Sequence, residues 1–205
     1  MTPRALVNFM QGKFIVLEGL DGSGITTQAT LLRNHLTDED KDAVLTKEPS
    51  DGLIGGIIKA CLRKEWKTNP AALQMLFAAD RSHHLTEEIE PALKKGKYVV
   101  CDRYILSSLA YGSMSISIDI IKQLNSHFRK PHLTIFVDTQ PKVCMDRMKK
   151  ARHHVELFED EQKLVQIRNN YLGLKNLFPN TVVIDGNRKA EEVHAEIKKI
   201  VRGLP

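Results

Sequence analysis

The chain has 205 residues, 42% of them hydrophobic and 27% charged, which is typical of a globular protein and excludes a disordered chain. This length suits one α/β domain, and we expect a single domain over residues 1–205. The net charge of +5 is compatible with a phosphate-bearing ligand, but without a dense basic run or an aromatic stacking cluster we expect no nucleic-acid partner.

The cysteines and the hydropathy pattern indicate a compartment. Cys61, Cys101 and Cys144 are odd in number and widely spaced, which argues against a disulfide framework and for a reducing environment. No apolar run approaches the length of a membrane span, and residues 1–11 lack the apolar core of a signal peptide. We therefore expect a cytoplasmic protein with no membrane partner.

Residues 14–28, FIVLEGLDGSGITTQ, predict a buried strand, a glycine-rich loop and the start of a helix. The spacing Gly19-x-x-x-x-Gly24-x-Thr26 is that of a P-loop, in which backbone N–H groups and a helix N-terminus cradle phosphates. The lysine expected before the threonine is replaced by Ile25. The loop therefore predicts phosphate binding without its usual cation.

Strand and helix patterns then alternate to the end of the chain. The strands expected after the first are residues 43–46, 97–102, 132–137 and 181–184. The expected helices are residues 52–62, 70–93 as one helix or two, a segment from 103 to 111, 117–128, a helix starting at 141, 158–177 and 190–200. This order predicts an α/β fold with a five-stranded parallel, doubly wound sheet and a ligand site at the carboxyl ends of its strands.

One pair on an expected helix and one aspartate at a strand end each admit a functional and a structural interpretation. Phe77 and Arg81 are four residues apart and share a helix face. They could face a ligand, or Phe77 could belong to the core and Arg81 could be a solvated charge. Asp102, at a strand end, could orient a nucleotide's magnesium or could cap a helix.

Two further segments carry polar patterns. Arg103, Ser107 and Tyr111 are spaced by four, so a helix here would align them as one polar stripe. A cation, a hydroxyl and a phenol in line at a strand end suggest a ligand wall more than a packing face. The basic run 147–154 could be a solvated face or a mobile lid over phosphates.

Six segments of the chain resemble the thymidylate kinases, a family of P-loop nucleoside monophosphate kinases. They are FIVLEGLDGSGITTQ, TKEP, LFAADR, VVCDRYILSSLAY, TIFVD and VVIDG, in the order and spacing of the family. The most specific is Asp-Arg-Tyr-x-x-Ser-x-x-Ala-Tyr. The resemblance implies the P-loop nucleoside monophosphate kinase fold with a short lid at about 149–158. It also implies transfer of the ATP γ-phosphate to dTMP, with Mg²⁺ as cofactor, and a homodimer.

The resemblance also implies site residues. For ATP they are Gly19, Leu20, Asp21, Gly22, Ser23, Gly24, Ile25, Thr26, Thr27 and Arg147. For dTMP they are Asp21, Glu48, Phe77, Arg81, Arg103, Ser107, Ser108 and Tyr111. The catalytic residues would be Asp21, Lys47, Asp102 and Arg103, and the metal-binding ones Asp21, Thr26 and Asp102.

The resemblance assigns a role to most of these side chains. Phe77 would stack on thymine, Arg81 would donate to a base carbonyl, and Tyr111 would crowd the 2′ position of the sugar. Arg103 would grip the acceptor phosphate, and Arg147 would pack against adenine. No general base is required, because the acceptor is already an anionic phosphate.

Three positions depart from the family. Ile25 replaces the P-loop lysine, Lys47 stands where arginine is more usual, and Gly112 stands where a polar side chain, often glutamine, is usual. Two alternatives to a dTMP kinase therefore stay open. One is a catalytically impaired nucleotide-binding paralogue that acts as a sensor or partner subunit. The other is a kinase for another pyrimidine monophosphate such as dUMP, which differs from dTMP by one methyl group.

Overall fold

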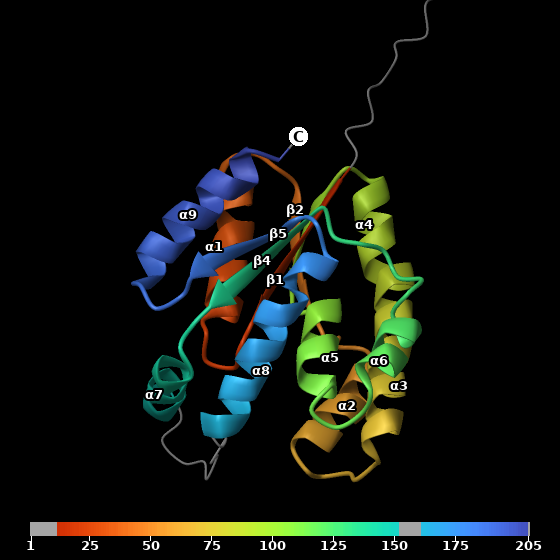
Figure 1. The fold of residues 1–205 in the computed structure, drawn as a ribbon. Coiled ribbons are helices and arrows are strands. Elements are labelled where there is room, and N and C mark those ends of the chain that lie inside the picture. Colours follow the sequence, from red (N-terminus) through yellow and green to blue (C-terminus); the bar gives the residue numbers. More distant parts are fainter. Residues whose placement is uncertain (1–11, 152–160, 205) are drawn as a thin grey trace, which may run out of the picture.

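The computed structural model describes residues 12–151 and 161–204, where five parallel strands form one sheet in the order β2-β3-β1-β4-β5 (Figure 1). The strands are β1 (Lys13–Gly19), β2 (Ala43–Lys47), β3 (Tyr98–Asp102), β4 (Leu133–Asp138) and β5 (Thr181–Asp185). Each lies where its apolar run predicts a strand. The expected five-stranded parallel sheet is confirmed.

Helices connect the strands. They are α1 (Ile25–Asp38), α2 (Leu53–Leu62), α3 (Pro70–His84), α4 (Glu90–Lys94), α5 (Ile105–Gly112), α6 (Ile118–Leu124), α7 (Pro141–Ala151), α8 (Glu161–Leu174) and α9 (Ala190–Arg202). A π-helical turn, Leu85–Ile89, joins α3 to α4, and a 3₁₀ turn, Lys175–Leu177, follows α8. In the described part of the chain, no helix is long and apolar enough to span a membrane.

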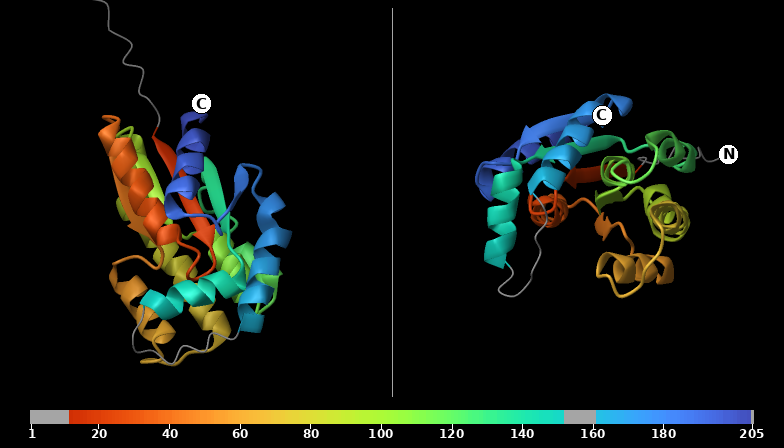
Figure 2. Two further views of the ribbon diagram at one scale, coloured as in Figure 1. Left: turned by 90° about the vertical axis from the view of Figure 1, so that its left-hand side faces the viewer. Right: turned by 60° about the horizontal axis from the view of Figure 1, so that its bottom comes forward.

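The sheet has a helical layer on each face, as Figure 2 shows from two further directions. Alternate residues of β1 supply the two cores, because successive side chains of a strand point to opposite faces. Ile15 and Leu17 pack in the cluster that contains the apolar residues of α1 and α9. Phe14 and Val16 belong to the cluster formed with α4, α5 and α8. The doubly wound arrangement is therefore confirmed.

The central position of β1 brings three strand ends together. In the parallel register Leu17 of β1 pairs with Asp102 of β3, and Lys47 of β2 pairs with the same aspartate. Gly19 pairs with Val137 of β4 on the other side. The loop after β1 therefore lies between neighbouring strand ends, where ligands bind in open parallel sheets.

Two helix boundaries differ from the expected ones. The helix expected from residue 103 begins at Ile105, because Arg103 has φ 74°, a left-handed conformation that an α-helix excludes. The helix expected over 117–128 ends at Leu124. There Asn125 Nδ2 donates 2.7 Å to the carbonyl oxygen of Ile121, which satisfies one of the carbonyls at the end of the helix.

Candidate active site

The P-loop runs from Gly19, at the end of β1, to the first residue of α1. Gly22 and Gly24 have φ of 78° and 95°, which non-glycine residues rarely adopt. A Cβ on Gly22 would also lie 2.5 Å from the carbonyl oxygen of Cys144 on α7. The side chains of Leu20 and Ser23 are buried, so the part of this loop available to a phosphate is mainly backbone.

The side chain of Ile25 does not face the loop's polar surface. It is 4% exposed and packs with Ile15, Leu17 and Ala29 in the core cluster beneath α1. If residue 25 contributes to nucleotide binding as expected, the contributing group is its backbone N–H and not its side chain. The position that usually carries a phosphate-binding cation here anchors the loop to the core.

Thr26, at the start of α1, is hydrogen-bonded to Asp102, at the end of β3. Thr26 Oγ1 donates to Asp102 Oδ2 at 2.5 Å, while Thr27 is exposed beside it at the start of α1. The other carboxylate oxygen, Oδ1, is buried and has no hydrogen-bond partner within residues 12–151 and 161–204. Hydroxyl and carboxylate oxygens are the ligands that Mg²⁺ prefers, so this pair has the chemistry to hold the cation of a nucleotide.

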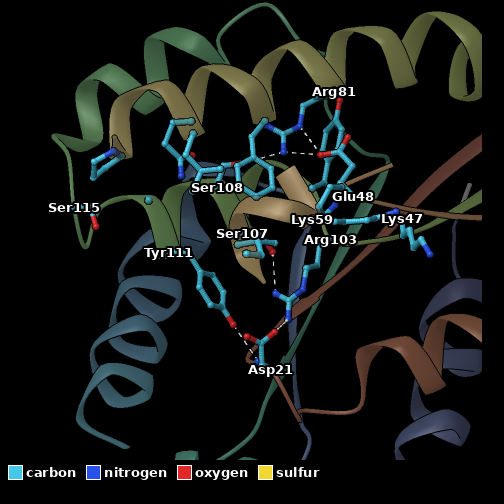
Figure 3. A pocket seen from close by; sticks show the side chains of 18 of the residues that line it. Asp21, Lys47, Glu48, Lys59, Arg81, Arg103, Ser107, Ser108, Tyr111 and Ser115 are labelled. Atoms are coloured by element: carbon cyan, nitrogen blue, oxygen red, sulfur yellow. Dashed lines mark hydrogen bonds and ion pairs between the residues drawn. The ribbon is translucent and has the colours of Figure 1, made fainter. Parts of the chain in front are cut away.

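Arg103 links the P-loop to the helix that follows β3. Its Nη2 donates to Asp21 Oδ1 at 2.5 Å, and its Nη1 donates to the carbonyl oxygen of Gly19 at 2.8 Å and to Ser107 Oγ at 3.2 Å. The guanidinium carbon lies 5.3 Å from the centre of the Tyr111 ring, and Tyr111 OH accepts from the Asp21 backbone N–H at 3.0 Å. Figure 3 shows Asp21, Arg103 and Tyr111 pointing toward one another. The expected polar stripe thus exists, although Arg103 precedes the helix.

Glu18 lies behind this arginine and is fully buried. Its Oε1 accepts from the Tyr104 N–H at 2.9 Å, and its Oε2 accepts from Ser107 Oγ at 2.5 Å and from Tyr171 OH at 3.2 Å. Burial raises the pKa of this carboxyl above its ordinary value, against the effect of these donors. Sequence reasoning missed Glu18, and the signal that could have found it is a charged residue inside an apolar strand.

Arg81 is 1% exposed, so its interpretation as a solvated charge is wrong. Its Nη2 lies 2.6 Å from Glu48 Oε2 and 3.0 Å from Ser108 Oγ. Nε donates to the same Glu48 oxygen at 2.8 Å, and Nη1 donates to Asn125 Oδ1. The guanidinium also lies 4.9 Å from the ring centre of Tyr104. Partners from three segments of the chain therefore fix its position.

One cavity of about 480 Å³ lies among these residues, and Figure 3 draws side chains that line it. It is lined by every residue that the resemblance implies for binding dTMP, and also by Lys47 and Asp102. Phe77 and Arg81 enter from α3, whereas Ser107, Ser108 and Tyr111 enter from α5. The cavity has Arg103 and Asp21 at the P-loop side and Arg81 on the opposite wall.

Two lysines reach the cavity from the side of β2 and α2. Lys47 Nζ lies 3.2 Å and Lys59 Nζ 2.6 Å from the same oxygen of Asp51. About half of the Lys47 side chain is exposed. Both lysines line the cavity, and Lys59 had no signal in the sequence that separated it from other surface lysines.

Arg147 is placed beside the P-loop rather than in this cavity. It donates to the carbonyl oxygens of Ser23, Gly186 and Arg188 at 3.2, 2.9 and 3.3 Å. It therefore joins the loop to the segment after β5. Of the lid expected at about 149–158, residues 152–158 lie outside the described part of the chain.

Comparisons with known proteins match nearly the whole chain. A family profile described as thymidylate kinase matches residues 17–197. A protein named probable thymidylate kinase from Pyrococcus abyssi is 40% identical over 94% of this chain and 97% of its own length. Proteins with the same name from Pyrococcus horikoshii and Methanocaldococcus jannaschii are each 38% identical, again over 94% of this chain and 97% of their own lengths.

Proposed function

The chain belongs to the thymidylate kinase family and is a phosphotransferase that phosphorylates dTMP with ATP; we propose how its residues divide this work. The observation that carries the proposal is the continuity of one cavity from the P-loop to Arg81. A nucleotide whose base lies between α3 and α5 has its phosphate at the Asp21–Arg103 pair. This pair lies beside the loop that holds the phosphates of ATP.

Two regions would hold the acceptor. Phe77 stacks on thymine, Arg81 donates to a base carbonyl, and Tyr111 faces the sugar. Ser107 and Ser108 line the same wall, and the buried Glu48 fixes Arg81 through the ion pair at 2.6 Å. The fixed guanidinium supports this assignment, because a donor held by its own partners loses little conformational entropy when it binds.

At the other end, Arg103 would neutralise the acceptor phosphate and Asp21 would hold Arg103 in place. Phosphoryl transfer needs little covalent chemistry from the protein, so positioning and charge neutralisation account for most of the catalysis. Backbone N–H groups of the P-loop would bind the phosphates of ATP, apart from those of Asp21 and Ser23, which donate to Tyr111 OH and to the carbonyl oxygen of Leu20. Arg147, which already spans Ser23 and Gly186, would flank its adenine.

Mg²⁺ is the expected cofactor, and the residues present fit it. Thr26 and Asp102 would hold it, with Asp21 beside them, and the unpartnered Oδ1 of Asp102 supports this assignment. When bound there, the ion would supply positive charge that neutralises the charge developing on the phosphate oxygens. Among the described residues, no three His, Cys, Asp or Glu side chains form a group that could hold a metal. The nucleotide phosphates would therefore complete the coordination.

The absence of the P-loop lysine should lower the turnover rate more than it weakens ATP binding. Backbone N–H groups survive at residues 19–27, but Ile25 offers no donor and is buried. Loss of cationic stabilisation in such sites can cost on the order of 10³-fold in rate. This feature favours a slow kinase, and it is also the observation that supports a nucleotide-binding protein without turnover as the second candidate.

We also propose a homodimer formed through α2 and the start of α3. Large apolar side chains are exposed there, and they are Leu53, Ile57, Leu62, Trp66 and Met75. Leu53 is 91% exposed. Apolar surface of this kind, gathered on one region, is typical of an interaction site.

One experiment separates the kinase from the second candidate. The protein is incubated with ATP, Mg²⁺ and dTMP, and the nucleotides are resolved by ion-exchange chromatography. The kinase forms ADP and dTDP in equal amounts, and ADP formation requires dTMP. Calorimetric binding of both substrates without formation of dTDP would instead support the binding protein.

A further inference from the structure

Gln74 shares a face of α3 with two residues of the acceptor cavity. Positions 74, 77 and 81 are separated by three and then four residues, so they lie in one row along the helix. Gln74 is 8% exposed and lines the cavity with Phe77 and Arg81. Sequence analysis gave Gln74 no role. Its place at one end of the row, with Arg81 at the other, puts the stacking ring of Phe77 between them.

Opposite Gln74, on α5, the chain has a glycine. A Cβ added to Gly112 would lie 2.7 Å from Cδ1 of Ile121, 2.8 Å from Cδ of Gln74 and 2.9 Å from Nε2 of Gln74. The amide of Gln74 therefore occupies the space that a side chain at position 112 would take. Position 112 is also one of the three that depart from the family, in which a polar side chain, often glutamine, is usual. An amide is thus present in the cavity wall, but it comes from the facing helix.

The amide oxygen of Gln74 lacks a hydrogen-bond donor. Oε1 is buried and has no hydrogen-bond partner anywhere in residues 12–151 and 161–204. An acceptor withdrawn from water without a donor destabilises the structure that contains it. A half-turn about the Cγ–Cδ bond exchanges the oxygen and the NH₂ group with little movement of the rest of the side chain. A ligand with a suitable donor can therefore recruit this oxygen.

Arg81 cannot supply that acceptor. A guanidinium has only N–H donors, whereas a glutamine amide has an acceptor and a donor side by side. Thymine presents a carbonyl, the N3–H and a second carbonyl in a row. Arg81 matches one carbonyl, and an amide matches the N3–H together with the other carbonyl. Between them the two residues of α3 would satisfy the whole polar edge of the base.

We propose that Gln74 is a specificity-determining residue of the acceptor site and that its amide bonds the N3–H edge of the pyrimidine. The inference rests on the proposed function, because it requires dTMP to occupy this cavity. The competing explanation is that the amide only fills the space over Gly112. The two explanations differ in what happens when the amide is replaced by an apolar group of similar size.

The first test uses Gln74→Met, which keeps the volume and removes both polar groups. We expect kcat/KM for dTMP to fall about tenfold, carried by KM, with the KM for ATP unchanged. Gln166→Met on α8, an exposed glutamine, serves as the control and should match the wild type. An unchanged KM for dTMP in a folded Gln74→Met protein would overturn the inference.

The second test removes the donor from the ligand. N3-methyl-dTMP lacks the N3–H, so the wild type should reject it by ~10²-fold or more. In Gln74→Met this discrimination should shrink by about tenfold, because only the steric part remains. Equal discrimination by both proteins would show that Gln74 does not read N3.

The third test relocates the amide. Gly112→Gln alone should impair dTMP binding, because its Cβ would collide with Gln74. Combined with Gln74→Ala, the new glutamine has only Ile121 Cδ1 left to displace, which is the end of a flexible side chain 2.7 Å from the added Cβ. The double variant should therefore recover a KM for dTMP below that of either single variant. A double variant no better than the single ones would support mere packing. If the wild type forms no dTDP, the proposed function fails; if it does and these variants behave like the wild type, only the role of Gln74 fails.

Discussion

Arg103 Nη2 lies 2.5 Å from Asp21 Oδ1, so the arginine after β3 and an aspartate of the P-loop form one ion pair, and both residues line the cavity. The same guanidinium donates to the carbonyl oxygen of Gly19 at 2.8 Å. Arg103 is therefore held by the P-loop and lines the cavity that we propose as the acceptor site. Its left-handed backbone, φ 74°, is a strained conformation of the kind that clusters at functional sites.

We expect Arg103→Ala to reduce kcat/KM for dTMP by ~10³-fold, because an arginine that neutralises a transferring or accepting phosphate contributes that much. The Kd for ATP should change only slightly, since the loop amides remain. Steady-state kinetics and calorimetry measure the two effects. Arg63→Ala, at an exposed arginine paired with Glu65, is the control. Equal losses of turnover and ATP affinity would indicate a structural role instead.

Ile25 packs in the core, but a lysine at this position has a longer side chain that can turn out of the core and extend to the phosphates. Ile25→Lys should therefore raise kcat by about tenfold or more, because the charge that grows between the β- and γ-phosphates gains a cation in the transition state. The Kd for ATP should change comparatively little. Ile25→Met, which is long but uncharged, is the matched control, and thermal unfolding reports the cost of altering a buried position. A kcat that stays the same or falls in a folded Ile25→Lys protein would contradict the proposal that the missing lysine slows catalysis.

Lys47 offers a competing source of that cation, since it lines the cavity from the end of β2. Combining the two positions decides between them. If Lys47→Ala abolishes activity in the Ile25 background and Ile25→Lys restores it, the phosphate-binding lysine has moved to position 47. If Lys47→Ala has little effect, no such relocation has occurred.

The fold and the P-loop could be predicted because their signals are local. Short apolar runs, glycine spacing and helical periodicity each occupy a few neighbouring residues. The surroundings of Arg81 could not, because its partners Glu48, Ser108 and Asn125 lie 33, 27 and 44 residues away. The bond between Glu18 and Tyr171 spans 153 residues. A burial that depends on such contacts leaves no periodic trace in the sequence.

His84 predicts how stability depends on pH. Burial alone would lower the pKa of His84, but the carboxylates of Glu48 and Glu88, with Oε atoms 3.3 and 3.4 Å from the ring nitrogens, raise it to about 9. Because the folded pKa exceeds the ordinary value of 6.5, the contribution is fully present below pH 6.5 and is lost as the pH rises through 9. The shift corresponds to ~3 kcal/mol.

Urea unfolding at a series of pH values measures this contribution. The free energy of unfolding of the wild type should fall between pH 6.5 and pH 9.5, and His84→Gln should remove most of that dependence. His83→Gln, at the exposed neighbour on α3, should leave the wild-type profile intact. An identical pH dependence in wild type and His84→Gln would show that His84 is not charged in the folded protein.

The exposed apolar residues of α2 predict the oligomeric state. Leu53→Lys should convert a dimer into a monomer, because a charge placed in an apolar interface is desolvated without a partner. Sedimentation equilibrium gives the mass of each species. Val165→Lys, at an exposed apolar residue of α8, should leave the dimer unchanged. A wild type that sediments as a monomer would rule out this assembly.

The central claim is that the cavity between α3 and α5 is a site for a pyrimidine deoxynucleotide. The most direct measurement is kcat/KM for dTMP, dUMP, UMP and dAMP in a coupled assay of ADP release. We predict that dTMP is best, with dUMP lower by about 10- to 100-fold because only one methyl group distinguishes them. UMP should be poorer because Tyr111 faces the sugar, and dAMP because a purine does not present the pyrimidine edge. If UMP or dAMP equalled dTMP, this account of the cavity would be wrong.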